Sequence, residues 1–452
     1  MKNIWTGQDL DNIEQFVEDG GTRVIVTDHL PPEASAMALA KYSRSSESFL
    51  IHLKEVVKSG WKQFLMKFYV NYGHASIGDC GSTTACLENV SMLNAVAYED
   101  DHAGGWQERS TRYQKMATQR ILNPLSTQTG EDIQERQRSL YMYLLEVLPQ
   151  HIRILFPKTP DTKEDVYENT ILSKACDIAG AFLPAGTTTS VGRHVDLRHL
   201  RDHLLVLRNY PLREVRETAE MLCQALSIQY PSSGFAKRYD ETERYAQLCS
   251  KHTYLPATKW WSEFLGSNTL DIPALREFAE ILSGRPEKAP LPQMLNNFGE
   301  IRYRHLIDDR SYRDEHRHCR SGAMYIPMLT TRFGFESWYL RRIPQEHLGH
   351  VLTALTEVTS LIEKLDCDDQ TRQYYVPMGH RVAVLASWRL PAAVYIADLR
   401  SGQTVHPTVR VAAQKMGRYL QETLPDLKLY CDYRPDIWST KRGEQTIIEK
   451  KD

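Results

Sequence analysis

Hydrophobic positions recur with the period of a helix late in each half of the chain, and in the same order. In the first half, the pattern predicts a helix over 199–207, a short break and a second helix over 212–226. In the second half, it predicts the same order over 390–403 and 406–424. Each second helix starts near a proline, which a first turn tolerates, and has one apolar face. The prolines are Pro211 and Pro407, and the faces are Val215, Ala219, Leu222 and Leu226 in the first half and Val409, Ala413, Met416 and Leu420 in the second.

The arrangement upstream of these helices is repeated as well. Residues 183–200 and 376–393 each start with an apolar residue followed by proline. Three pairs of residues give similar offsets, which are 193 from Pro184 to Pro377, 192 from Arg208 to Arg400 and 201 from Arg112 to Arg313. An offset near 200 indicates a duplicated domain, and a chance match of two helical pairs is the alternative.

The length of the chain agrees with a duplication. A chain of 452 residues exceeds one ordinary hydrophobic core, so two domains of roughly 200 residues or one large α/β unit are expected. Residues 231–234, Pro-Ser-Ser-Gly, have the composition of a loop and predict the linker. We therefore expect one domain over 1–230 and a second over 235–452.

Composition and charge narrow the class of protein. Hydrophobic residues make up 42% and charged residues 25% of the chain, which is typical of a globular protein. The formal net charge of −2 argues against a surface that coats polymeric nucleic acid. The N-terminus has no signal-peptide pattern, and no stretch approaches the roughly 20 apolar residues of a membrane span. A cytoplasmic protein without a membrane partner is expected.

Cysteine and histidine residues do not predict a metal site. The eight cysteines are scattered without a Cys-x-x-Cys pair, so reduced and mostly buried thiols are expected. The cluster of His305, His316, His318 and Cys319 has no recognised ligand spacing and stands among arginines, so no metal is predicted. The chain also has no Gly-x-Ser-x-Gly nucleophile elbow and no glycine-rich phosphate loop.

The most specific segment is Gly-Trp-Gln-Glu-Arg-Ser-Thr-Arg-Tyr-Gln-Lys-Met at 105–116, preceded by Tyr-Gly-His-Ala-Ser-Ile-Gly-Asp at 72–79. Together with the downstream Leu-Pro step and the paired helices, this order resembles the flavin-dependent thymidylate synthases (ThyX) over most of residues 20–230. The matching residues are Glu108, Ser110, Arg112 and Tyr113 of the family's Glu-x-Ser-x-Arg-Tyr motif, and His74 and Ser76 of its Gly-His-x-Ser element. The resemblance implies an α+β fold with two tandem domains, each a central antiparallel sheet with flanking helices.

The resemblance also implies roles for individual residues. Ser110 and Glu108 would be catalytic residues, although Ser110 would not be a conventional covalent nucleophile. The nucleotide-binding residues would be Arg112, Arg208, Gln107 and Arg400, and the flavin-binding residues His74, Ser76, Ser43, Asp196, Arg198, Arg304 and His305. Arginine suits a nucleotide phosphate because its planar guanidinium binds phosphate through two hydrogen bonds. The cofactor would be FAD, with NADPH and methylenetetrahydrofolate as co-substrates.

Simpler structural interpretations exist for three of these residues. Glu108 and Arg112 are four positions apart and could form a solvated ion pair on a helix. His74 could cap a helix, and Arg208 could be an exposed charge at a helix end.

The first half departs from the family pattern at two places. Counting back from Glu108, the family's Arg-His-Arg triplet is replaced by Asp100, Asp101 and His102, and carboxylates would repel a pyrophosphate. Gly180 stands where the family has an arginine, four residues before the proline of the Leu-Pro step.

The second half departs in nearly the opposite way. Arg304 and His305 stand in an Arg-His context, followed by Leu306 in place of arginine. Its Ser311 and Arg313 come too early and lack the glutamate and tyrosine, and no Gly-His-x-Ser element precedes them. In addition, Arg389-Leu-Pro391 replaces the Asp196-Leu-Arg198 of the first half.

Complementary losses suggest a composite site. One site per chain would combine the Glu-x-Ser-x-Arg-Tyr segment of the first half with Arg304 and His305 of the second, and replacing Arg304 should then abolish flavin or nucleotide binding. A homodimer would imitate the family's tetramer. The expected function is C5 methylation, or a related one-carbon modification, of dUMP or a related uridine nucleotide. The alternative is a nucleotide-binding or flavin-binding protein without turnover, which acts as a sensor or scaffold.

Overall fold

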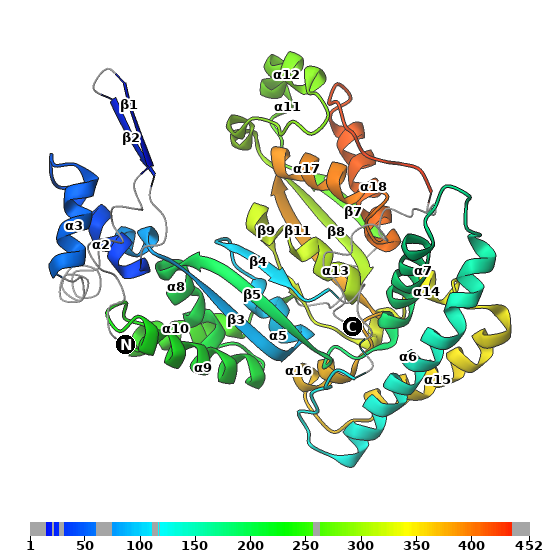
Figure 1. Ribbon diagram of the computed structural model, residues 1–452. Coiled ribbons are helices and arrows are strands. Elements are labelled where there is room, and N and C mark those ends of the chain that lie inside the picture. The colour runs from blue at the N-terminus through cyan, green and yellow to red at the C-terminus, as the bar shows by residue number, and fades with distance from the viewer. Residues whose placement is uncertain are drawn as a thin grey trace. The chain divides into compact units, whose positions relative to one another are not determined.

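The computed structural model describes residues 15–19, 22–26, 31–59, 75–110, 116, 118–255 and 263–435. Helices and small, mainly antiparallel sheets make up these residues (Figure 1), which confirms the expected α+β class. The chain forms two compact units, each assembled from several segments. The first unit contains Met1–Leu87, Ala103–Gln107 and Val191–Lys251, and the second contains Glu88–His102, Glu108–Ser190 and His252–Asp452.

Helices dominate the first unit, beside one antiparallel hairpin. Its elements are β1 (Gln15–Asp19), β2 (Thr22–Val26), α2 (Pro32–Tyr42), α3 (Phe49–Ser59), η2 (Ala75–Cys80), α8 (Leu197–Arg208), α9 (Arg213–Gln229) and α10 (Asp240–Ser250). Buried side chains of α2 and α3 form a small apolar core. One further sheet has the strand order β3-β5-β4, with β3 (Ser82–Ser91), β5 (Thr188–Asp196) and β4 (Gly105–Glu108).

The second unit is built around a four-stranded antiparallel sheet. Its order is β7-β8-β11-β9, with β7 (Phe264–Asn268), β8 (Glu300–Asp308), β11 (Arg381–Arg389) and β9 (Gly322–Met324). In the central pair, Val384 of β11 lies opposite His305 of β8. Tyr303 and Trp388 are fully buried in the core that this sheet shares with α17 (Leu390–Arg400) and α18 (Pro407–Thr423).

Other short strands and helices complete the second unit. They are α5 (Met92–Glu99), α6 (Gln128–Leu155), α7 (Glu164–Ala179), η3 (Gly180–Phe182), β6 (Tyr254–Leu255), α11 (Ile272–Leu275), η4 (Arg276–Phe278), α12 (Ala279–Gly284), η5 (Gln293–Phe298), α13 (Asp309–His316), η6 (Cys319–Ser321), β10 (Ile326–Pro327), η7 (Thr331–Phe333), α14 (Ser337–Leu340), α15 (Gln345–Glu363), α16 (Asp369–Arg372) and η8 (Gln373–Tyr375). Strands β6 and β10 pair in parallel.

The two predicted helix pairs are confirmed as α8 with α9 and α17 with α18. The predicted apolar faces of α9 and α18 are buried, as the period of the α-helix requires. Pro407 is the first residue of α18. Pro211 instead precedes Leu212, the N-cap of α9, so its placement inside the first turn is wrong.

Corresponding elements support an internal duplication. The shift along the chain that takes Pro184 to Pro377 also takes β5 onto β11 and η3 onto η8. A larger shift takes α5 onto α13, and both helices begin after an N-cap side chain, Ser91 or Asp308. The shift is larger upstream because the first half is longer between these elements, where α6 is longer than α15. Under the α5-to-α13 shift, Arg313 corresponds to Val96, so the third sequence offset, from Arg112, is not supported.

The Leu-Pro and Val-Pro steps pair with each other inside the second unit. Ala185 N–H donates to Val376 C=O at 3.0 Å, and Met378 N–H donates to Leu183 C=O at 2.9 Å. The shift that takes Pro184 to Pro377 also takes Ala185 to Met378 and Leu183 to Val376. The two hydrogen bonds are therefore equivalent when the two segments are exchanged. Residues 181–186 and 374–379 therefore meet around a local two-fold axis, with Pro184 opposite Pro377.

Residues 231–234 form a turn, as predicted, but they are not an exposed linker. Ser232 and Ser233 are buried, and the Glu33 carboxylate accepts hydrogen bonds from the Ser232 N–H, at 3.2 Å, and from the Ser233 hydroxyl, at 2.6 Å. The division into repeats at 1–230 and 235–452 stays a prediction.

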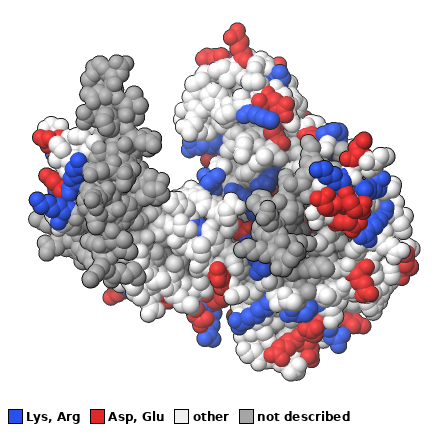
Figure 2. All heavy atoms as spheres, viewed as in Figure 1, with Lys and Arg blue, Asp and Glu red and all other residues white. Residues whose placement is uncertain are grey.

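All eight cysteines are free, as expected for reduced thiols. The expectation that most are buried is wrong, because only Cys176, Cys223 and Cys319 are, while Cys86 and Cys249 are exposed. Lys and Arg side chains alternate with Asp and Glu side chains on the face shown in Figure 2. Within the described part of the chain, no helix is long and apolar enough to span a membrane.

Candidate functional site

Glu108 is the last residue of β4, and its side chain is buried. Successive strand residues alternate between exposure and burial, so Gln107 is exposed while the Glu108 side chain is 4% exposed. The Glu108 carboxylate accepts a hydrogen bond from the guanidinium of Arg313 on α13. Because Glu108 lies on a strand, the expectation that it lies on a helix is wrong, and its suggested partner Arg112 lies outside the described residues. A cation from the second half of the chain thus holds the glutamate of the first half.

Two further buried acids interact with Arg313. Burial, assisted by the negative charge of Glu108 and opposed by Arg313, raises the pKa of Glu99 to about 8. Burial also raises the pKa of Asp309 to about 7, again opposed by Arg313. Near neutral pH, Glu99 therefore keeps its proton, and Glu108 is the carboxylate that pairs directly with Arg313.

Arg310, one turn before Arg313 on α13, fills the space beside Gly180. Its Nη1 donates to the carbonyls of Cys176 at 2.9 Å and Asp177 at 3.1 Å. A Cβ atom at residue 180 would lie 1.8 Å from this nitrogen, so a side chain there is incompatible with the position of Arg310. Gly180 is the position at which the resemblance implies an arginine in the first half. Arg310, from the second half, fills the space beside it.

The segment that replaces the Arg-His-Arg triplet contacts the end of α13. Asp100 Oδ1 lies 3.0 Å from His316 Nε2, and the Cys319 thiol lies 3.6 Å from the carbonyl oxygens of Glu99 and Asp101. Burial raises the pKa of the Cys319 thiol to about 12. This cluster combines an acid, an imidazole and a thiol from two distant segments.

Arg317 and His318 correspond to Asp100 and Asp101 under the shift that takes α5 onto α13. The sequence interpretation missed this pair and favoured Arg304 and His305. The signal that could have found it is the shared helix start, since α5 and α13 each follow an N-cap residue and have equal lengths. Arg317 is exposed, while His318 is buried.

His318 contacts Arg400, one of the predicted nucleotide-binding residues. Arg400 Nε donates a hydrogen bond to His318 Nε2 at 2.8 Å. Burial, assisted by the positive charge of Arg400, lowers the pKa of His318 to about 3, so the ring stays neutral and can accept this bond. Arg400 is therefore held next to the Arg-His pair at 317 and 318.

Arg304 and His305 are neighbours on β8, where successive side chains point to opposite faces of the sheet. His305 is buried, and its Nε2 lies 2.9 Å from Glu315 Oε2. Arg304 is half-buried. Their predicted flavin-binding role stays a prediction.

Four predicted flavin-binding residues lie on or next to packed elements of the first unit, where η2 packs against α8. Asp196 caps α8 by accepting the His199 N–H at 2.9 Å. Arg198 forms an ion pair with Asp79 of η2, the helix that also carries the exposed Ser76. Ser43 lies at the end of α2, which packs on η2 as well, and its hydroxyl donates to the Ala40 carbonyl at 3.0 Å.

The remaining predicted residues are distributed differently. Arg208 is the last residue of α8, and its Nη2 donates to Glu243 Oε1 at 2.5 Å. Its side chain is buried, so the interpretation as an exposed charge is wrong. Ser110 is half-buried, just beyond β4. His74 and Arg112, with Tyr113, lie outside the described residues.

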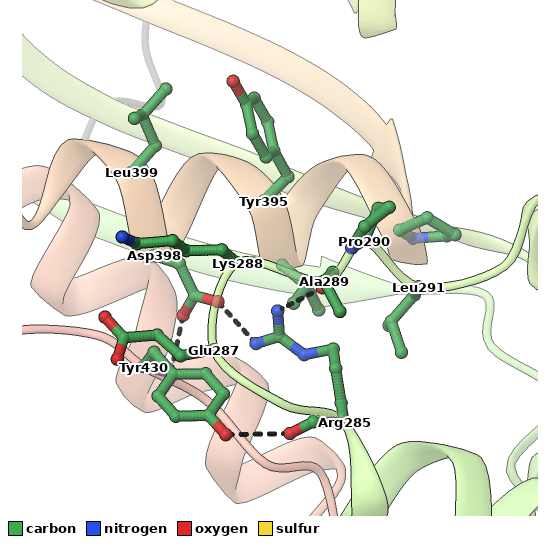
Figure 3. Close-up of a pocket in the computed structure, with 12 residues that line it drawn as sticks. Arg285, Glu287, Lys288, Ala289, Pro290, Leu291, Tyr395, Asp398, Leu399 and Tyr430 are labelled. Carbon is green, nitrogen blue, oxygen red and sulfur yellow. Dashed lines mark hydrogen bonds and ion pairs between the residues drawn. The ribbon is translucent and has the colours of Figure 1, made fainter.

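A cavity of about 430 Å³ lies elsewhere in the second unit, between α17 and residues 285–291 (Figure 3). Arg285 closes its base and donates to the Asp398 carboxylate at 2.5 Å and to the Ala289 carbonyl at 2.9 Å. The guanidinium thus holds the loop in place, and none of the predicted site residues lines this cavity.

Comparisons with known proteins agree with the motif. Residues 25–232 match the family model described as thymidylate synthase complementing protein. A UPF0159 protein of Chlamydia muridarum is 23% identical, over 94% of this chain and 94% of its own length. A UPF0159 protein of Chlamydia pneumoniae is 25% identical, over 49% of this chain and 47% of its own. The match covers less than half of the chain, so residues 25–232 are similar to the thymidylate synthase complementing protein family, the ThyX family that the motif resembles.

Proposed function

We propose that the protein is a flavin-dependent thymidylate synthase-like enzyme that methylates C5 of dUMP, or carries out a related one-carbon modification of a uridine nucleotide. The family match supports the class of reaction. The observation that carries the proposal is the buried pair of Glu108 and Arg313, because a fixed carboxylate can accept hydrogen bonds from a nucleotide. Arg112 and Arg208 would bind its phosphate, with Ser110 beside the pyrimidine and Gln107 assisting.

The residues present fit FAD better in the second half than in the first. At residues 100–101, two carboxylates would repel its pyrophosphate. Arg317 and Arg320 are exposed beside the end of α13, and Arg400 lies against His318. These three arginines would hold the phosphates. Ser43, His74, Ser76, Asp196 and Arg198 stay candidates for flavin binding on the ground of the resemblance alone. When bound, FAD would supply hydride obtained from NADPH, and methylenetetrahydrofolate would supply the carbon.

The proposal keeps a composite site, but its residues from the second half are Arg310 and Arg313 in place of Arg304 and His305. Arg313 holds Glu108, and Arg310 fills the space beside Gly180. These contacts support the idea that one chain builds one site from its two repeats, 1–230 and 235–452. In this proposal, Arg310 and Arg313 orient the first half's residues, while Arg304 and His305 are secondary candidates.

A nucleotide-binding protein without turnover is the second candidate. The specific observation in its favour is the acidic pair Asp100 and Asp101 at the position of the flavin triplet. Such a protein would keep the nucleotide site at Glu108 and lose the cofactor.

The deciding experiment is the visible absorbance spectrum of the purified chain, before and after NADPH, with and without dUMP. We expect a flavin spectrum that NADPH bleaches faster when dUMP is present. In R313M, the acceleration by dUMP should fall at least tenfold, because the Glu108 carboxylate loses its partner. R136M is the matched control, since Arg136 forms an exposed ion pair with Glu357.

A colourless protein that cannot be reconstituted with FAD, but binds dUMP, would establish the binding protein instead. Wild-type kinetics in R313M would disprove the role of the Glu108 pair. Circular dichroism shows whether R313M is folded, and E108Q/R313M, which removes both charges, provides a second variant if R313M is not.

A further inference from the structure

Three different metal-binding side chains meet where residues 99–101 approach the end of α13. Asp100, His316 and Cys319 place a carboxylate oxygen, an imidazole nitrogen and a sulfur within 4.8 Å of one another. His316 is the last residue of α13, and Cys319 is the first residue of η6, three positions later. All three belong to the second unit.

The distances suit a small divalent ion after a minor adjustment. Zinc binds nitrogen and oxygen at about 2.0–2.2 Å, which in a tetrahedron separates the two ligand atoms by roughly 3.4 Å. Asp100 Oδ1 and His316 Nε2 are 3.0 Å apart, so they need to separate by only a few tenths of an ångström. A sulfur ligand at about 2.3 Å from zinc would lie roughly 3.6 Å from the other two ligand atoms, and the Cys319 sulfur lies within 4.8 Å of both.

Burial and exposure are distributed as a site with an open position requires. The His316 side chain is 1% exposed and Cys319 is buried, whereas the Asp100 side chain is 36% exposed. An ion can therefore enter from the side of Asp100. Three protein ligands leave a fourth position there for water or another ligand.

Buried polar side chains surround the cluster. Glu99, Glu108 and Glu315 are buried acidic side chains near this region, and Arg313 is paired with Glu108. Glu99 Oε1 and His316 Nδ1 are buried without a hydrogen-bond partner among the described residues. Buried polar atoms without partners often mark an ion or water that completes the site.

The other two histidines of the sequence cluster are engaged elsewhere. His305 contacts Glu315, and His318 accepts from Arg400. The ligand set thus could not be found by spacing alone, because Asp100 and His316 stand in different halves of the chain.

We propose that Asp100, His316 and Cys319 bind one zinc-like divalent cation. The ion would join the two halves of the chain where the first half has lost the basic triplet. A bound cation lowers the pKa of a coordinating thiol, so Cys319 would bind as the thiolate. This proposal does not depend on the proposed enzymatic function.

The test uses the full-length protein, purified without a polyhistidine tag, treated with a chelator and titrated with Co²⁺ and then Zn²⁺. We expect one Co²⁺ per chain with a thiolate-to-metal absorption band that Zn²⁺ abolishes. C319S should lose the thiolate band, and H316A and D100N should bind Co²⁺ at least tenfold more weakly. D100N is the variant least sensitive to folding, because Asp100 is the exposed member.

H199A is the matched control, because Asp79, Asp196 and His199 form the other such group among the described residues. Its Co²⁺ spectrum should equal that of the wild type. Absence of a stoichiometric thiolate band, or its persistence in C319S, would overturn the proposal. Loss of binding in H199A with full binding in H316A would assign the ion to the other group, and would overturn it as well.

Discussion

At the scale of single residues, His380, which immediately precedes β11, is buried. Its ring is 2% exposed, its Nδ1 lies 3.2 Å from the Pro377 carbonyl, and the Phe335 ring packs edge-on against it. Burial lowers its pKa to about 4, from an ordinary 6.5. The folded chain therefore keeps this ring neutral at pH values where an unfolded chain protonates it.

This pKa difference predicts how stability depends on pH. Between pH 6.5 and 4, the unfolded state binds a proton that the folded state does not, so the free energy of unfolding decreases as the pH falls. The contribution of His380 is on the order of 3 kcal/mol for the full shift. In H380Q, the loss between pH 7 and pH 4 should be smaller by up to this amount, measured by urea unfolding. H350Q, at an exposed position of α15, should follow the wild type, and an unchanged pH dependence in H380Q would contradict the prediction.

Single residues also show where sequence reasoning stops. Glu108 could be predicted from its motif, but its partner Arg313 lies in the other half of the chain and has no motif of its own. The pair depends on packing that brings α13 to the end of β4. Similarly, the sequence shows that residue 180 is a glycine. It does not show the reason, which is that the guanidinium of Arg310 fills the space beside it.

At the scale of elements, α13 matters because both Arg310 and Arg313 project from it toward residues of the first half. Replacing Gly180 by alanine tests the first of these contacts. The new Cβ would lie 1.8 Å from Arg310 Nη1, so the arginine must move and lose its bonds to the end of α7. We expect G180A to destabilise the protein by about 1–3 kcal/mol, measured by thermal unfolding.

Gly349, in α15, is the matched control because a Cβ there would meet no atom within 4 Å. G349A should be neutral or stabilising by up to about 1 kcal/mol, since alanine favours a helix more than glycine does. Equal stability of G180A and G349A would show that Arg310 is not held as described.

Elements differ in how far their sequence predicts them. Helices α8, α9 and α18 carry an apolar face along their own length, so the periodic pattern is sufficient. The correspondence of α5 with α13 was not predicted, because their sequences share little beyond a helix start after a capping side chain. The pairing of 181–186 with 374–379 is a long-range contact between backbones, which no side-chain pattern specifies.

At the scale of the whole molecule, the compact units and the repeats are different divisions. The repeats describe which segments correspond in sequence, whereas the units describe which segments pack together. Residues 88–102 and 108–190 fall in the first predicted repeat but in the second unit. A duplication can be inferred from offsets along the chain. Which segments of the first repeat pack into the second compact unit cannot be inferred in this way.

The proposed duplication leads to a prediction of the mass in solution. Two tandem ThyX-like repeats per chain would need two chains to imitate a four-subunit assembly, so we expect a homodimer. Sedimentation equilibrium should give about 104 kDa, twice the 52.1 kDa of one chain. A mass of one or of four chains would contradict this arrangement.

The local two-fold axis between Pro184 and Pro377 has a further consequence for how this protein can change. In an assembly of identical subunits, every substitution appears on both sides of each symmetry axis. In a fused chain, each side is encoded separately, so one half can acquire Arg313 while the corresponding position of the other keeps Val96. Fusion therefore allows the two halves to differ in sequence, so a substitution that specialises one half leaves the corresponding position of the other half unchanged.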